Sequence, residues 1–375
     1  MSAYSQPQGH RSMVFDDVRN TYYAEAIKKA VNERSTVLDL GAGLGLHGFI
    51  AANAGARKVF MVEPAPILEV TRQLVSENNL HEQVECISER IEEVDLPGKV
   101  DVIVSVFTGN FLLTEDLLPS LFFARDKFLA PGGKLIPDRA VMEVVPVSAA
   151  AYYAKHIDCW NTGSQGVAYN RVRDYAANTL FYDGADNLKT SFLSKPAELL
   201  EMDFMTATEA CCRSRIEVKV EEDGLCHGWL GWFRTRLGDQ WLSTSPLEEA
   251  THWSQVFLPL AKPIVVNKGQ ILGFELDRPE FGEWSWVVEH EGEKQRHSTF
   301  LSEPISPSTL QKKSDKHRPR ISDQGLVALE VLSRFKGKAS TADIINYVAT
   351  GHAKLFPTHK SADQFVKKLV DKHGI

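Results

Sequence analysis

A glycine-rich loop between a strand pattern and a helix pattern constrains the fold of this chain more than any other feature. The loop, residues 39–45 (DLGAGLG), follows the β-branched run at residues 36–40 and precedes helix-forming residues 46–54. Glycine lets the backbone turn sharply and approach a ligand without a clash at Cβ. Strand, loop and helix in this order are typical of an α/β sheet that binds NAD, FAD or another nucleoside.

The same alternation continues to about residue 138. The further segments are strand patterns at residues 58–63, 101–106 and 134–136, and helix patterns at residues 67–78 and 117–129, the last of which we expect to end at the Pro-Gly-Gly of residues 131–133. Nearly continuous apolar strands separated by helices predict a parallel sheet that is covered on both faces. We therefore predict a Rossmann-like α/β domain over residues 1–138.

The pattern changes from residue 139 onward. Short β segments follow, separated by Gly, Pro and Asp turns, at residues 141–147, 214–220, 228–234, 264–266, 271–276 and 284–289. They predict an antiparallel barrel or sandwich over residues 139–303. Residues 150–187, rich in Tyr, Asn, Asp and Gly with some helical stretches, form an insertion. Residues 304–320 are polar and charged and predict a linker, and residues 321–375 have the helical spacing of a small winged-helix-like module.

Composition excludes several classes of protein. With 43% apolar and 24% charged residues the chain is that of a soluble globular protein. No apolar run approaches the ~18 residues of a membrane-spanning helix, and the first residues lack an apolar signal core. Five scattered cysteines without a C-x-x-C pair favour reduced thiols in the cytoplasm and provide no metal site.

The net charge of −7 is divided unevenly along the chain. Residues 311–375 contain 13 Lys/Arg and 6 Asp/Glu, a balance of +7, so the preceding part carries −14. The basic residues cluster in a linker without interleaved aromatic residues. A solvated charged surface is therefore favoured over a nucleic-acid interface.

Two carboxylates beside the glycine loop indicate the ligand. Asp39 stands two residues before Gly41, where it would repel a diphosphate but attract a cationic ligand that carries an amino acid. The next strand pattern ends at Glu63, whose carboxylate can accept both ribose hydroxyls. Together they predict S-adenosylmethionine as the cofactor.

The predicted strand at residues 101–106 leads into a loop at the same edge of the sheet. Because chemistry in open parallel sheets occurs at the carboxyl ends of the strands, we expect residues 107–110 to face the methyl acceptor. Glu115 and Asp116 follow, and we expect them at the start of the next helix. There they either take part in the acceptor site or complement the helix dipole.

Four longer segments resemble the protein arginine methyltransferases, and the resemblance extends over most of residues 10–300. The segments are VLDLGAGLGLHGFIAANAGARKVFMVEP, ERIEEVDLPGKVDVIVS, ARDKFLAPGGKLIPDRA and LSTSPLEEATHW. The resemblance implies a Rossmann-type cofactor domain followed by a β-barrel. It also implies that a helical arm, here about residues 150–187, grips a second subunit to form a homodimer.

The resemblance also implies roles for individual residues. The cofactor-binding set is His10, Arg19 (for the cofactor carboxylate), Asp39, Gly41, Gly43, Gly45, Glu63 (for the ribose), and Ile91 and Glu92 (for the adenine). The catalytic set is Glu115, which orients or deprotonates the acceptor, Asp16 paired with His252, and Trp253, which lines the pocket. Without the resemblance, His252 fits an ordinary structural histidine and Trp253 fits a barrel-core aromatic residue.

One departure from the family concerns the acceptor. Val106 stands where the family has the first of two glutamates that clamp the guanidinium, and Glu115 matches the second. A guanidinium stays protonated and needs carboxylates when it is buried, and removal of one partner costs ~3–5 kcal/mol. An arginine site therefore needs compensation, for example from Asp116 or from a carboxylate of the substrate.

Three hypotheses about function follow. The first is methylation of an arginine guanidino nitrogen, or a related nitrogen, in a small molecule, peptide or protein. The second is methylation of a different N, O or S nucleophile that tolerates Val106, for example in natural-product or peptide tailoring. The third is a non-catalytic scaffold that binds S-adenosylmethionine. The C-terminal module is either a peptide-recognition element or a structural cap.

Overall fold

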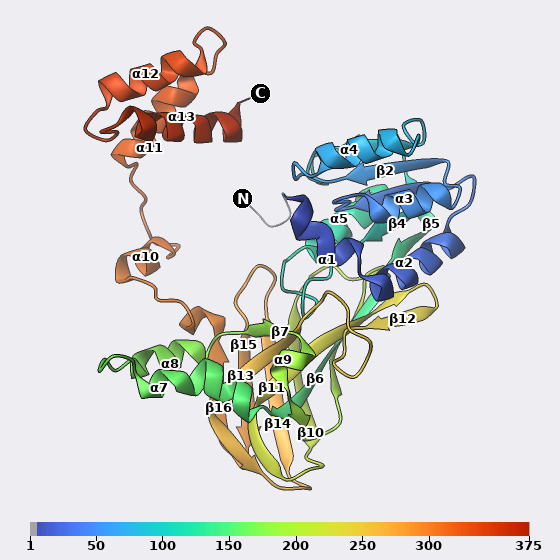
Figure 1. The fold of residues 1–375 in the computed structure, drawn as a ribbon, viewed down its shortest axis with the longest axis vertical. Coiled ribbons are helices and arrows are strands. Elements are labelled where there is room, and N and C mark those ends of the chain that lie inside the picture. The colour runs from blue at the N-terminus through green and yellow to red at the C-terminus, as the bar shows by residue number, and fades with distance from the viewer. Residues whose placement is uncertain (1–5, 375) are drawn as a thin grey trace. The chain divides into compact units, whose positions relative to one another are not determined.

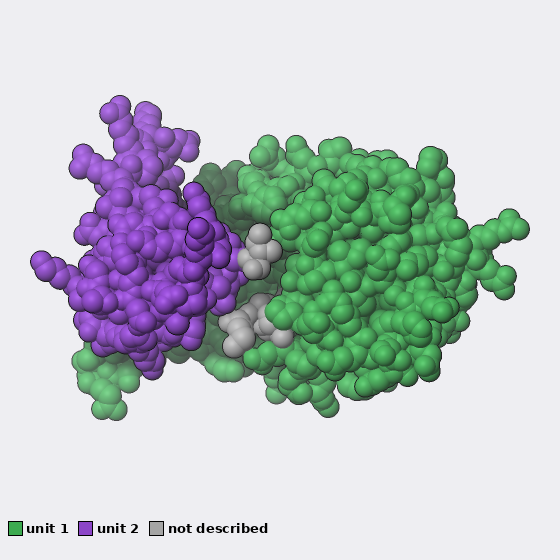
Figure 2. Space-filling model, turned by 90° about the horizontal axis from the view of Figure 1, so that it is seen from above, with its two compact units in different colours: residues 1–304 green, residues 305–375 purple. Residues whose placement is uncertain are grey.

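The computed structural model describes residues 6–374. The chain divides into two compact units, Met1–Pro304 and Ile305–Ile375, which are coloured separately in Figure 2. The first contains all of the strands drawn in Figure 1 and the second only helices. Among residues 6–374 there is no helix with the length and apolarity needed to cross a membrane.

A five-stranded parallel sheet forms the centre of the first part of unit 1, as predicted. Its strand order is β3-β2-β1-β4-β5, with bounds β1 Thr36–Leu40, β2 Lys58–Val62, β3 Val84–Ile87, β4 Val100–Ser105 and β5 Leu129–Ile136. The helices are α1 Arg11–Val14, α2 Asp17–Ala30, α3 Leu46–Asn53, α4 Leu68–Glu77 and α5 Leu118–Phe128, preceded by the 3-10 turn Pro7–His10. All five residues of β1 are buried, which explains why its sequence is mostly apolar.

Two boundaries differ from the prediction. The Pro-Gly-Gly of residues 131–133 was expected to end a helix, but it lies inside β5, and a shift of the β4–β5 register between Val100 and Val102 accommodates it. Glu115 and Asp116 were expected in the first turn of a helix, but α5 begins only at Leu118. They therefore lie in the preceding loop, so the explanation by helix-dipole complementation does not apply.

Two antiparallel sheets follow, as predicted for the barrel domain. One has the strand order β7-β13-β11-β6-β8, with β12 paired to β11 and β9 paired to β6, and the other has the order β10-β14-β15-β16. The bounds are β6 Arg139–Ser148, β7 Phe181–Asp183, β8 Ser191–Phe192, β9 Ala197–Asp203, β10 Cys212–Lys219, β11 Gly224–Leu237, β12 Gln240–Ser243, β13 Gln255–Val266, β14 Ile271–Arg278, β15 Ser285–His290 and β16 Glu293–Ser298. Trp229 stacks on Phe274 between the sheets, with ring centroids 4.5 Å apart.

The insertion after β6 is helical. It comprises α6 Ala150–Tyr153, the π-helical turn Ala154–Asp158, α7 Cys159–Thr162, α8 Asn170–Ala176 and, after β7, α9 Ala185–Leu188. A small separate core that includes Tyr152, Tyr153 and Ile157 attaches it to the barrel strands. The Tyr153 hydroxyl also donates to the carbonyl oxygen of Leu260 over 2.8 Å.

Unit 2 has its own hydrophobic core. Its main helices are α11 Asp323–Ser333, α12 Thr341–Gly351 and α13 His359–His373, which begin after the N-caps Ser322, Ser340 and Thr358. Val331, Val348 and Val366 are fully buried between them. Residues 305–374 contain no strand, so the predicted helices are present but the β wing is not. The predicted linker also contains a short helix, α10 Pro307–Lys312.

Candidate functional site

The glycine loop has the backbone that the sequence predicts. Gly41, Gly43 and Gly45 have φ angles of +71°, +54° and +79°, which L side chains rarely adopt. A Cβ on Gly41 would also lie 2.3 Å from the Phe107 ring, and one on Gly43 would lie 2.9 Å from His10. Gly41 and Gly43 are therefore restricted to glycine by conformation and by space, and the contact of the neighbouring His10 with the cofactor stays a prediction.

A carboxylate lies on each side of this loop. Asp39 is only 2% exposed, and its Oδ2 accepts a hydrogen bond from the Gly48 amide over 2.8 Å. Burial, reinforced by the nearby charge of Glu63, raises the pKa of Asp39 to about 7 against the opposing effects of Gly48 and Arg19. Glu63 accepts from the Gly43 amide over 3.1 Å and from the Ala65 amide over 2.8 Å.

Arg19 brings a buried cation to the same place. It lies in the first turn of α2, is 3% exposed, and donates to the Met13 carbonyl oxygen over 2.6 Å. Its charge influences the pKa of Asp39. A buried cation beside a buried acid matches the carboxylate and ammonium groups of an amino acid. With the glycine cradle and Glu63, this set of groups fits S-adenosylmethionine.

The adenine residues are less defined. Ile91 is buried, whereas Glu92 is exposed and accepts a hydrogen bond from the Ser120 hydroxyl over 2.6 Å. Their contact with an adenine stays a prediction.

Two residues that hold the loop were not identified from the sequence. Thr71, in α4, is fully buried and donates to the Gly43 carbonyl oxygen over 2.6 Å. Gly48, in α3, donates to Asp39. A glycine inside a helix is costly, so Gly48 offered a signal, whereas the contact of Thr71 lies 28 residues away and offered none.

Gly48→Ala should weaken cofactor binding. The added Cβ would lie 2.4 Å from the Met61 methyl and 3.0 Å from Asp39 Oδ2, so Asp39 must shift although the methionine can yield. We expect the Kd for S-adenosylmethionine, measured by calorimetry, to rise about tenfold. This is the value of one hydrogen bond between the displaced Asp39 and the cofactor. Gly98→Ala, which meets no atom within 4 Å, is the control. Equal affinities for both variants would contradict the prediction.

Residues 107–116, called the acceptor loop below, lie between β4 and α5 and contain one acid, Asp116, that is bound by the barrel. Asp116 Oδ2 accepts from Arg278 over 2.6 Å, and Oδ1 accepts from the Phe281 amide over 2.9 Å. The expectation that Asp116 compensates for Val106 is therefore not met, because the buried Arg278 already requires this carboxylate. Glu115 is exposed, and a Cβ on Gly109 would lie 3.1 Å from its Cγ.

The structure brings Asp16 and His252 together. Asp16 Oδ2 lies 2.7 Å from His252 Nδ1 and accepts from the His252 amide over 2.8 Å, while Oδ1 accepts from the Arg19 amide at the start of α2. Burial opposes ionisation of Asp16, but these hydrogen bonds outweigh it and lower its pKa. Burial also lowers the pKa of His252. A carboxylate and a neutral imidazole are therefore present at neutral pH.

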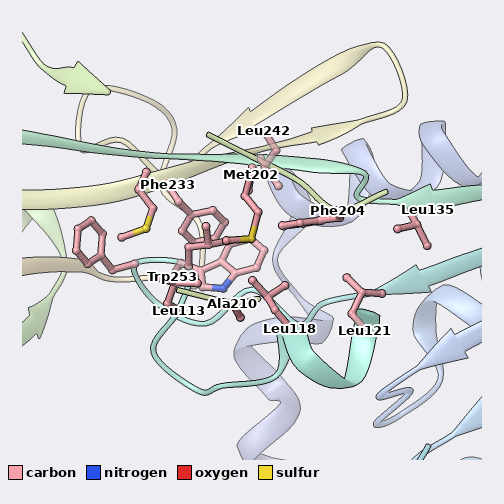
Figure 3. Close-up of a cluster of buried hydrophobic side chains, with 14 of the residues drawn as sticks. Leu113, Leu118, Leu121, Leu135, Met202, Phe204, Ala210, Phe233, Leu242 and Trp253 are labelled. Atoms are coloured by element: carbon pink, nitrogen blue, oxygen red, sulfur yellow. The ribbon is translucent and has the colours of Figure 1, made fainter. Parts of the chain in front are cut away.

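Trp253 lies in the hydrophobic core rather than in an open pocket. It is 6% exposed, and Figure 3 shows its ring among the side chains of Leu113, Phe233 and other core residues. Its indole N–H donates to the Thr108 carbonyl oxygen over 2.9 Å. The structure therefore shows Trp253 as an anchor for residues 107–116, and its role in lining the acceptor pocket stays a prediction.

Comparisons with known proteins agree with this architecture. Residues 37–133 match the family model described as a methyltransferase domain, and residues 138–279 match the arginine methyltransferase oligomerization subdomain. Protein arginine N-methyltransferase 6 of Danio rerio is 35% identical over 327 residues, covering 80% of this chain and 92% of that protein. Histone-arginine methyltransferase CARMER of Anopheles gambiae is 36% identical over 290 residues, covering 72% of this chain and 46% of that protein.

Solved structures extend the likeness to the fold. A Trypanosoma brucei PRMT1 enzyme-prozyme heterotetrameric complex with AdoHcy contains a chain that superposes with a TM-score of 0.74 at 27% identity, covering 79% of this chain and 99% of that one. Arabidopsis thaliana protein arginine methyltransferase 10 gives 0.67 at 28% identity, with coverage of 79% and 99%. The chain spans about half the length of the CARMER relatives. With the Danio rerio relative matched over nearly its whole length, the chain belongs to the protein arginine methyltransferase family.

Proposed function

We propose that this protein is an S-adenosylmethionine-dependent methyltransferase that acts on an arginine guanidino nitrogen or a related nitrogen of a small molecule, peptide or protein. The observation that carries the proposal is the grouping of Asp39, Glu63 and Arg19 around the glycine loop, with Glu115 on the loop that follows β4. The AdoHcy in the Trypanosoma brucei complex supports the choice of cofactor.

Each group has a role in this proposal. Arg19 would hold the cofactor carboxylate, Glu63 the ribose, and Ile91 and Glu92 the adenine. When bound, S-adenosylmethionine supplies a methyl group on a sulfonium. Glu115 would accept a hydrogen bond from an N–H of the methyl acceptor and so orient the acceptor nitrogen toward that methyl group. The Asp16–His252 pair would hold the start of α2, and with it Arg19, in place. In this proposal the protein contributes orientation and proximity rather than strong base chemistry.

Val106 favours a second candidate function. The side chain packs against the hydrophobic core, and Asp116 is held by Arg278, so Glu115 lacks the second carboxylate that a guanidinium needs. A neutral N, O or S nucleophile would tolerate this site. A non-catalytic subunit that binds the cofactor would tolerate it too, and the pairing of an enzyme with a prozyme in the Trypanosoma brucei complex makes that possibility worth testing.

One experiment separates these candidates. Calorimetry measures S-adenosylmethionine binding to the wild type and to Glu63→Ala, and mass spectrometry then follows labelled methyl transfer to arginine, arginine peptides and a cell extract. Methylated arginine supports the first candidate, and another methylated component supports the second. Binding without transfer favours the subunit, whereas unaltered binding by Glu63→Ala contradicts the cofactor assignment.

We also propose that the protein is a homodimer held together by the arm at residues 150–187. We further propose that it is located in the cytoplasm. The match of residues 138–279 to an oligomerization subdomain supports assembly, and the cysteines of the described chain are free thiols, as expected in a reducing compartment. Light scattering should give twice the chain mass, and replacing residues 159–176 with a short Gly-Ser linker should give the monomer.

Deletion of residues 305–375 should leave cofactor affinity unchanged within about twofold, because unit 2 has a separate core. If the module recognises peptides, KM for a peptide acceptor should rise while KM for free arginine stays the same. If the deletion changes neither the KM for the peptide nor the KM for free arginine, the module is a structural cap.

A further inference from the structure

The loop that carries Glu115 is held in an unusual backbone conformation. Phe111, Leu112 and Asp116 have φ angles of +51°, +62° and +52°, a region that non-glycine residues rarely adopt. The turn closes through a bridge between Gly109 and Leu112, in which the Gly109 amide donates over 3.2 Å. Such conformations persist only where the surroundings determine them, so contacts outside the loop must supply the constraint.

Arg278, the last residue of β14, contacts the C-terminal end of this segment. Its side chain is 2% exposed, and its two terminal nitrogens donate to Asp116 Oδ2 and to the Pro279 carbonyl oxygen, each over 2.6 Å. The other oxygen of Asp116 accepts from the Phe281 amide. Because a buried guanidinium requires its carboxylate partner, this ion pair ties the loop to the barrel at Asp116.

Stacked rings tie the same segment at its other end. The guanidinium carbon of Arg278 lies 5.4 Å from the ring centroid of Trp284. Trp284 stacks in turn on Phe111, with centroids 5.5 Å apart and planes at 23°. Phe111 is fully buried, and its ring fills the space beside Gly231, where a Cβ would lie 2.5 Å away. Arg278 therefore acts on residue 116 directly and on residue 111 through Trp284.

We propose that Arg278 and Asp116 are positioning residues that set the place of the Glu115 carboxylate, an inference that rests on the proposed methyltransferase function. Glu115 precedes Asp116 in the chain, and its side chain lies against Gly109. Loss of the ion pair lets residue 116 leave the left-handed region, and Glu115 moves with it. The contacts of Arg278 are with the acceptor loop and the barrel, so cofactor affinity stays unchanged.

The test is a double-mutant cycle with Glu115. Arg278→Met and Asp116→Asn should each lower kcat about 10- to 100-fold, the effect of a displacement of about 1 Å at a reacting group. Affinity for S-adenosylmethionine, measured by calorimetry, should stay within about twofold of the wild type in both. In a Glu115→Gln background Arg278→Met should have no further effect, because both changes act through one carboxylate. Arg278→Lys keeps the positive charge but not the two donating nitrogens of the guanidinium, so its kcat should fall between those of Arg278→Met and the wild type.

Hydrogen exchange at the amides of residues 107–116 gives a readout independent of turnover. Exchange should accelerate in Arg278→Met and Asp116→Asn but not in the control Arg213→Met, whose exposed side chain pairs with Asp277. Unchanged exchange, or losses of kcat that multiply with those of Glu115→Gln, would overturn the proposal. If Arg278→Met does not fold, Asp116→Asn carries both measurements. A wild type that methylates no acceptor would refute the proposed function, whereas accelerated exchange would still support the tie to the loop.

Discussion

Asp39→Asn should make the ligand-free protein more stable at pH 8 and at the same time weaken its binding of S-adenosylmethionine. The pKa of Asp39 is raised from 3.8 to about 7 by burial. Between these two values the folded protein keeps a proton that the unfolded chain has lost, so stability falls as pH rises and the loss is complete above pH 7. Asparagine carries no charge at any pH, and its Oδ1 can still accept from the Gly48 amide.

The expected gain in stability can be bounded. At about 1.4 kcal/mol per pKa unit, the stability recovered at pH 8 is at most about 4 kcal/mol, which corresponds to several degrees in Tm. Thermal unfolding from pH 5 to pH 9 measures it, and the difference from the wild type should shrink toward pH 5. Asp95→Asn, at an exposed position, should show no comparable trend. If Asp39→Asn has a lower Tm than the wild type at pH 8, the ionised Asp39 does not destabilise the folded protein and the prediction is wrong.

Binding should change in the opposite direction. An ionised Asp39 attracts the cationic cofactor, and loss of a hydrogen bond to a charged group costs about 1.5–3 kcal/mol, or roughly 10- to 150-fold in Kd. For the wild type, Kd should rise up to about tenfold for each pH unit below pH 7, because Asp39 must then lose a proton before it can attract the cofactor. Asp39→Asn should lose this pH dependence. A pH dependence that persists in the variant would assign it to another group.

Val106→Glu should raise arginine methylation by about 10- to 150-fold, since a second carboxylate next to a guanidinium is worth about 1.5–3 kcal/mol in a charge-assisted hydrogen bond. Asp116 cannot serve this purpose while Arg278 holds it. Initial rates with an arginine peptide measure the effect, and Val106→Gln, polar but uncharged, is the control. Equal rates for the two variants would show that the added charge does not reach the acceptor and that the site has diverged beyond this position.

The parts of the fold that could be predicted from the sequence are those set by local pattern. Buried parallel strands such as β1 are buried at every residue and mostly apolar, so β1, β2 and β4 could be predicted, whereas the four-residue β3 contains the exposed Glu85 and was missed. The glycine loop and its two acids were predictable because each lies next to a strand end. The family resemblance, rather than the local pattern, led to the pairing of Asp16 with His252.

The rest depended on contacts between distant segments. Arg278 and Asp116 are 162 residues apart, and nothing near either residue indicates that one neutralises the other. Trp253 illustrates the same limit, because its contacts with Thr108 and Phe233 join residues that are far apart in the chain, and the sequence near residue 253 does not indicate them. The wing expected in unit 2 followed from helical spacing alone, which contains no information about a hairpin.

Trp253 joins the hydrophobic core to the acceptor loop through the hydrogen bond from its indole N–H to the Thr108 carbonyl oxygen and through packing near Leu113. Substitutions that repack its neighbours, Phe233 and Leu113, therefore shift the loop without touching any ligand. In the evolution of this chain, changes of acceptor could accumulate as conservative exchanges between apolar residues in the interior. A laboratory selection for a new acceptor should accordingly recover interior positions as well as those that contact the acceptor.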